Sequence, residues 1–106
     1  MREKIQMIST GCTGENLFCL PCGEEEIAVM YITYQQDEET VLEKTKEDCV
    51  FEGETACLTL SQEDSLKFDP DAEILIQIRI RLTDGRAIKS DIMRAAADRL
   101  LKDGVI

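Results

Sequence analysis

The sequence predicts an all-β fold, a small antiparallel β-sandwich formed by a single domain over residues 1–106. Three observations support this. Isoleucine or leucine occupies every second position from Ile74 to Leu82, a period of two that a helix does not produce. The dipeptide Asp84-Gly85 follows this run and favours a tight hairpin, because glycine tolerates positive φ. The run from Ile27 to Tyr34 is rich in β-branched and aromatic residues, as strands are.

The N-terminal part of the chain is predicted to hold one strand. Residues 1–14 are mixed in character and end in turn-forming residues, so we expect an irregular lead-in. Glu15 to Leu20 is short and is closed by Pro21. This pattern is typical of an edge strand, because proline cannot donate a hydrogen bond to a sheet.

A hairpin is predicted around the polar residues 35–39. The strand over 27–34 carries apolar residues on both faces, which places it centrally in a sheet. The alternating segment from Thr40 to Lys46 is the return strand. Two more strands follow, Cys49 to Phe51 and Thr55 to Leu60, separated by a glycine-containing turn. The second of them places apolar side chains on one face: Ala56, Leu58 and Leu60.

One short helical turn is predicted near residues 61–68. The Ser61 hydroxyl can cap its first turn, and the Asp64 side chain, three residues later, can accept from the Ser61 amide in return. The sequence Asp69-Pro70-Asp71 ends it, because proline cannot continue a helix.

The strand from Ala72 to Thr83 has two different faces. Burying its five apolar side chains contributes about 1.5–3 kcal/mol each before entropy is subtracted. The opposite face carries Gln77, Arg79 and Arg81. The return strand of the Asp84-Gly85 hairpin begins near Arg86.

The last segment has two competing interpretations. Apolar residues fall at helical spacing over 91–102, and Gly104 could close such a helix. The hairpin, however, requires an extended chain from Arg86 to about Met93. We expect an extended strand to about Ala97 followed by a short turn, with a C-terminal helix as the alternative.

The composition excludes several functions. The net charge is −10, from 22 acidic and 12 basic residues, and such a surface repels phosphate backbones. We therefore expect no nucleic-acid binding; an acidic surface aimed at a basic partner is the alternative. No apolar run is long enough for a membrane span or a signal peptide, so we expect a cytoplasmic start with five reduced cysteines.

No catalytic pattern is present. Histidine is absent, which excludes the usual serine and cysteine nucleophile systems, and no glycine-rich phosphate loop occurs. The pair Cys19 and Cys22 has oxidoreductase spacing, but three glutamates follow and would raise a thiol pKa. A zinc site would need this pair and two of Cys12, Cys49 and Cys57, but a second C-x-x-C is missing. A calcium site would use Asp64, Asp69 and Asp71, which lack the EF-hand spacing. We expect no enzyme, cofactor or metal.

Several motifs resemble a known family. They are LTLSQEDSLKF at residues 58–68, IQIR at 76–79 and LKDGVI at 101–106. The chain resembles, over about residues 14–106, a family of small uncharacterised proteins encoded among tail and baseplate genes of Firmicutes prophages. It is more distantly similar to the immunoglobulin-like N-terminal domain of phage baseplate upper proteins. The resemblance implies an immunoglobulin-like sandwich, with the SQEDSLKF turn linking strands across the two sheets, and a role in building a virion.

The expected function is therefore that of a non-catalytic tail or baseplate protein that docks onto other phage structural proteins. The row of Gln77, Arg79 and Arg81 is the candidate partner surface. We expect no membrane partner and leave self-association open. The protein would be made in the bacterial cytoplasm and end in the virion. The alternative is an acidic regulatory protein that binds a basic host nucleic-acid-binding protein.

Overall fold

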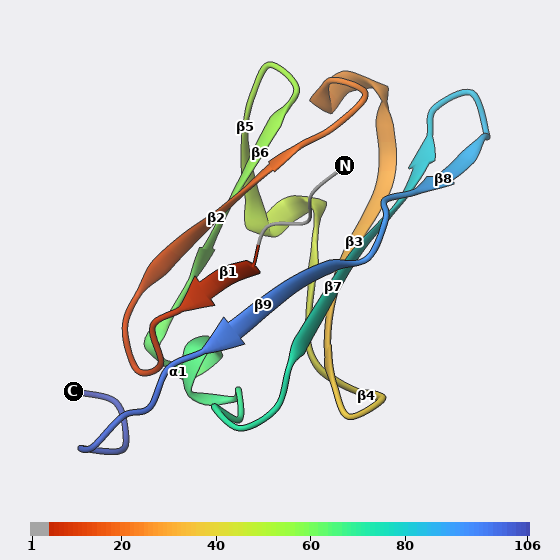
Figure 1. Ribbon diagram of the computed structural model, residues 1–106. Coiled ribbons are helices and arrows are strands. Elements are labelled where there is room, and N and C mark those ends of the chain that lie inside the picture. The colour runs from red at the N-terminus through yellow and green to blue at the C-terminus, as the bar shows by residue number, and fades with distance from the viewer. Residues whose placement is uncertain (1–4) are drawn as a thin grey trace.

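A computed structural model describes residues 5–106, with the backbone alone for residues 5–7. Nine strands and three short helical turns form two packed layers (Figure 1). The strands are β1 (Ile5–Ile8), β2 (Gly14–Cys19), β3 (Ile27–Gln36), β4 (Glu39–Thr45), β5 (Cys49–Glu52), β6 (Thr55–Leu60), β7 (Ile74–Leu82), β8 (Ala87–Lys89) and β9 (Met93–Ala97). The helical turns are η1 (Glu24–Glu26), η2 (Lys46–Asp48) and α1 (Gln62–Leu66).

The strand order identifies the type of sandwich. The larger sheet runs β1-β9-β7-β3-β4, with β8 also paired to β7, and the smaller sheet runs β2-β6-β5. If β8 and β9 are counted as two halves of one last strand, this is the G-F-C-C′ and B-E-D arrangement of immunoglobulin variable-type domains. The all-β, immunoglobulin-like prediction is confirmed, and β3 is central while β2 is an edge strand, as expected.

The core forms where the inner faces of the two sheets meet. Alternate residues of β7 are buried there, and Ile74 and Ile76 have no exposed surface. Ala56, Leu58 and Leu60 of β6 face them from the smaller sheet. The period-two prediction is therefore confirmed on both sides of the sandwich.

The Asp84-Gly85 hairpin also forms as predicted. Gly85 has a φ of 94°, and the Leu82 amide donates to the Arg86 carbonyl across the turn. The Asp84 carboxylate accepts from the Arg86 amide and guanidinium, and these contacts lower the pKa of Asp84. A turn with positive φ at glycine closes the β7–β8 pair.

The irregular lead-in predicted over residues 1–14 is wrong for part of its length. β1 pairs with β9 in parallel, with Ile5 opposite Arg94 and Ile8 opposite Ala97. β1 carries no isolated signal of its own, because its hydrogen-bonding partner lies at the other end of the chain. Residues 9–13 are irregular as predicted, and residues 1–4 lie outside the described residues.

The C-terminal helix alternative is wrong, and the extended strand to Ala97 is confirmed. β9 is antiparallel to β7, with Ala95 opposite Ile74, and buries Ala95 and Ala97 in the core. Residues 98–106 form no helix. The backbone hydrogen bonds that β7 and β1 offer outweigh the helix propensity of the alanine run, a common case of tertiary context deciding.

The predicted helical turn is α1, and it carries the chain from the smaller sheet to the larger one. The Ser61 hydroxyl accepts from the Asp64 amide at 3.1 Å, and the Asp64 carboxylate accepts from the Ser61 amide, so the predicted cap is confirmed. The Asp64 carboxylate also binds the Lys44 ammonium at 3.1 Å. Burial alone would raise the pKa of Asp64, but the Ser61 and Lys44 contacts outweigh it and lower the pKa.

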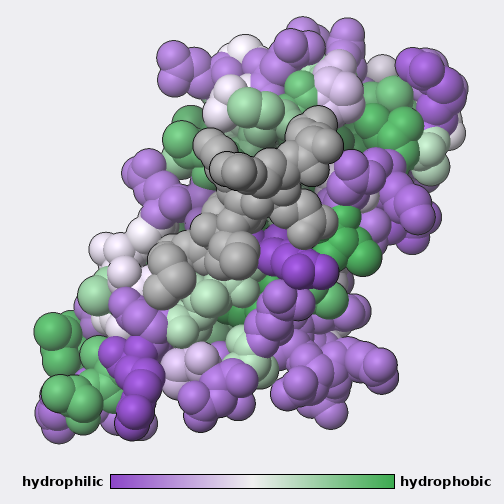
Figure 2. Space-filling view, in the orientation of Figure 1, coloured by the Kyte–Doolittle hydropathy of each residue, from purple (hydrophilic) through white to green (hydrophobic). Residues whose placement is uncertain are grey.

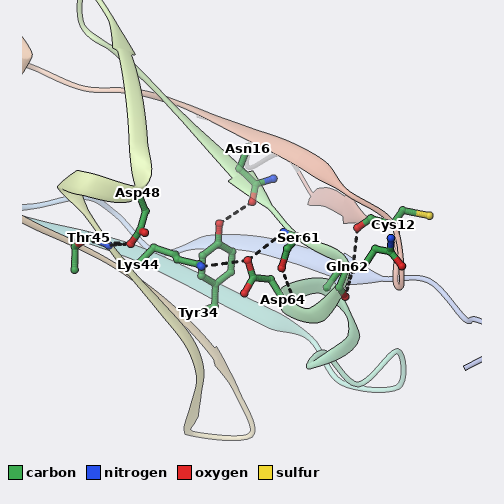
Figure 3. A network of polar contacts seen from close by, with 10 residues as sticks. Cys12, Asn16, Tyr34, Lys44, Thr45, Asp48, Ser61, Gln62 and Asp64 are labelled. Atoms are coloured by element: carbon green, nitrogen blue, oxygen red, sulfur yellow. Dashed lines mark hydrogen bonds and ion pairs between the residues drawn. The ribbon is translucent and has the colours of Figure 1, made fainter. Parts of the chain in front are cut away.

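A buried hydrogen bond joins the two sheets next to this turn (Figure 3). The Tyr34 hydroxyl of β3 donates to the Asn16 side-chain oxygen of β2 at 2.7 Å. Both residues are buried, and burial, with smaller contributions from Cys49 and Asp64, raises the pKa of Tyr34, so its hydroxyl stays protonated and available as a donor. The described residues include no helix long and apolar enough to cross a membrane.

Candidate interaction surface

The predicted partner row lies on the outer face of the larger sheet. The pleat of β7 turns Gln77, Arg79 and Arg81 away from the buried isoleucines. Arg79 and Arg81 are exposed, and neither forms an ion pair with a described residue. The structure therefore places the three residues on one face as expected, with two free cations among them.

Gln77 differs from its two neighbours because it is half-buried and already bonded. Its amide donates to the Ser90 carbonyl at 3.1 Å. Ser90 begins the break between β8 and β9, where its amide donates to the Ile78 carbonyl and its hydroxyl accepts from the Ile78 amide. Gln77 holds this irregular segment in place and contributes less free polar surface than the sequence suggests.

Three further residues complete the surface, and sequence reasoning missed them. The register of the sheet places Tyr31 of β3 and Lys89 of β8 on either side of Arg79. The break after Ser90 turns Ile92 outward, so that it is 50% exposed. No local signal marked Ile92, because it has the same parity as the partly buried Ile88 and a regular strand would turn both inward. We call Tyr31, Gln77, Arg79, Arg81, Lys89 and Ile92 the basic face.

The basic face is hollowed and its charge is opposite to that of the whole chain. A depression of about 210 Å³ is lined by residues of β3, β7 and the break: Thr33, Gln35, Leu75, Ile76, Gln77, Arg79 and Ile92. Residues 74–97 contain five basic and two acidic residues, whereas the whole chain carries −10. Tyrosine and arginine around an apolar centre are typical of protein interfaces.

Arg79 and Lys89 lie directly opposite each other on β7 and β8. Like charges in such cross-strand pairs are destabilising by about 0.2–1 kcal/mol. This pair therefore costs stability in the free chain. Unfavourable local contacts of this kind are expected at functional sites, such as a surface that binds a partner.

The environments of Cys22 and Cys49 do not favour a reactive thiol. Cys19 is exposed while Cys22 is buried, and burial together with Glu26, Glu54 and Glu25 raises the pKa of Cys22. Burial raises the pKa of Cys49 to about 11. Raised values disfavour the nucleophilic thiolate.

Among the described residues no three cysteine, aspartate or glutamate side chains converge on one point, so the zinc and calcium alternatives gain no support. Asp64 is engaged by Lys44, and the Asp69 carboxylate accepts from the Asp71 amide within its own turn. The carboxylates weighed for calcium therefore serve a helix cap and a turn.

No protein-family model and no curated protein matches this chain. One similar solved structure is the V domain of amphioxus IgVJ-C2, which is 12% identical and covers 88% of this chain and 99% of its own, with a TM-score of 0.35. A likeness this distant carries no argument, and the assignment of the fold rests on the strand order described above.

Proposed function

We propose that this domain is a non-catalytic docking module of a phage tail or baseplate, and that its basic face binds an acidic surface of another structural protein. The phage setting comes from the sequence resemblance alone. Docking is supported by one observation: Arg79, Arg81 and Lys89 gather around the exposed Tyr31 and Ile92 with no ion pair to a described residue.

The charge pattern supports an acidic partner. The whole chain has a net charge of −10, so an acidic partner is attracted only where it approaches the three cations of the basic face. These charges therefore favour one orientation of the partner as well as faster association. The depression beside them accepts an apolar side chain at the centre of the contact. In this proposal the protein is made in the bacterial cytoplasm and is incorporated into the virion.

The double variant Arg79→Ser/Arg81→Ser tests the face directly. We expect it to abolish co-purification with tail proteins from a phage lysate, with little change in the melting temperature, because both side chains are exposed and unpaired. The matched control is Lys67→Ser/Arg86→Ser, which removes two cations elsewhere: Lys67 is exposed, and Arg86 is paired with Asp84. Equal capture of both variants would contradict the proposal.

The variant Lys89→Glu should raise stability and lower docking at once. It replaces the like-charged pair with Arg79 by an attractive one, so we expect the free energy of unfolding to rise by about 0.2–1 kcal/mol. It also places an acidic group on the basic face, which weakens capture by tail proteins. Urea unfolding and the same pull-down measure the two effects. Capture at the wild-type level would mean that Lys89 is no part of the interface.

A second candidate function has its own observation. Glu24, Glu25, Glu26 and Glu54 line a hollow between the start of β3 and the β5–β6 turn, and this acidic cluster suits a basic partner such as a host nucleic-acid-binding protein. In that case a pull-down from host lysate yields a basic protein that DNA displaces. The Arg79→Ser/Arg81→Ser variant would retain this capture, which separates the two candidates.

A further inference from the structure

We infer that copies of this chain associate head to tail, with residues 100–106 of one copy bound in a groove beside β2 of the next. This association does not require the proposed docking to an acidic partner, although Lys89 of the basic face also lines the groove. Two features of one chain carry it: an apolar groove with an unpaired strand edge, and an exposed apolar segment at the opposite end of the molecule.

The groove lies between β2 and β8. It has a volume of about 150 Å³ and is lined mainly by apolar residues, among them Leu17, Leu20, Pro21, Ile80, Ile88 and Met93. An apolar cavity of about this volume holds a six-carbon ring such as benzene. The groove is therefore large enough for a leucine or isoleucine side chain.

The backbone of β2 beside the groove has free hydrogen-bonding groups. The Leu20 amide donates to the Glu54 carbonyl, just beyond the β2–β6 pairing. The even-numbered residues of β2 therefore direct their amide and carbonyl groups toward β6. In an antiparallel pair the alternate residues point their amide and carbonyl groups the other way. Leu17 and Cys19 therefore direct theirs to the free edge, where no described strand pairs with β2. Such an edge accepts an additional strand.

The C-terminal segment, residues 100–106, is the complementary feature. Four of its seven residues are large and apolar, and Leu101 and Ile106 are 98% and 91% exposed. Figure 2 shows hydrophobic atoms gathered at this end of the molecule. The segment is held by two hydrogen bonds between the Gln62 side chain and the Ile106 backbone, at 2.8 and 3.1 Å.

The placement of the two features favours a second copy as the partner. Met93, at the start of β9, lines the groove, and the chain then runs away from it through Ala97 to the C-terminal segment (Figure 1). Gln62 holds that segment at the α1 end of a molecule that is 47 Å long. The segment of one copy thus points away from its own groove and is open to the next. A contact between two different surfaces gives an open chain or a ring rather than a closed dimer.

Two variants separate the features while leaving the fold intact. Leu101→Asp/Ile106→Asp disables the C-terminal segment, and Leu17→Asp disables the groove at a side chain that is 60% exposed. Val50→Asp, on the outer face of the same sheet and outside the groove, is the matched control. In sedimentation, the wild type and the control should gain mass with concentration, while each disabled variant stays a monomer.

Mixing the two disabled variants is the most stringent test of head-to-tail association. One supplies an intact groove and the other an intact segment, so the mixture should form a one-to-one dimer and nothing larger. A labelled peptide of residues 100–106 should bind the variant Leu101→Asp/Ile106→Asp, whose groove is intact. Its affinity should fall about tenfold or more when Leu17→Asp is added to that variant. A wild type that stays monomeric, a mixture that forms no dimer, or a peptide indifferent to Leu17→Asp would overturn the inference.

Discussion

Replacing Ile76 with alanine should lower the free energy of unfolding by about 2–5 kcal/mol. Ile76 lies in β7 with no exposed surface, and β7 is hydrogen-bonded to strands on both sides. Truncation removes three carbons from the interior and leaves a cavity that the surrounding strands fill only in part. A domain of this size has a total stability of about 5–15 kcal/mol, so the loss is a large share of it.

The matched control for this prediction is Arg79→Ala on the same strand. Arg79 points to the opposite face and is exposed, so its truncation should not lower stability, and the lost repulsion with Lys89 should raise it by up to about 1 kcal/mol. Urea unfolding of both variants measures the difference. If the two variants lost equal stability, β7 would not have one face in the core and one in solvent.

The second large effect is expected for Tyr34→Phe. The change removes one oxygen and leaves the Asn16 side-chain oxygen, 2.7 Å away, without its donor inside the protein. A buried polar group without a partner costs about 1–3 kcal/mol. The ring contact with Phe68, at 5.6 Å between centroids, is retained, so the loss reports the hydrogen bond rather than packing.

The double variant Tyr34→Phe/Asn16→Leu serves as its control. Replacing both partners by apolar groups removes the unsatisfied acceptor, so the double variant should be more stable than Tyr34→Phe alone. Thermal and urea unfolding of the four chains in this cycle give the coupling. Additive losses would mean that the two side chains do not interact in the folded protein.

Sequence reasoning succeeded where the signal is local. The alternation over β7, the Asp84-Gly85 turn and the Ser61–Asp64 cap each depend on residues within a few positions of one another, and all three are present. It failed for β1, whose partner among the described strands, β9, lies about 90 residues away in the chain. It left β9 ambiguous because an alanine-rich run suits a helix until a neighbouring strand offers it hydrogen bonds.

The candidate surface was predictable in part for the same reason. The row of Gln77, Arg79 and Arg81 follows from the pleat of a single strand. Tyr31 and Lys89 join it only through the register of β3 and β8 against β7, which no local pattern encodes. The hydrogen bond from the Gln77 side chain to the Ser90 carbonyl also depends on that register, because Ser90 lies on the return strand.

The most direct test of docking through the basic face is zero-length carbodiimide cross-linking in a phage lysate at low salt. Lys89 is the one cross-linkable amine of the basic face, and an acidic partner must present a carboxylate beside it. We predict a cross-link from Lys89 to a tail or baseplate protein, lost at high salt and in Arg79→Ser/Arg81→Ser. Cross-links to tail proteins that arise only from lysines elsewhere, such as Lys67, would contradict the account.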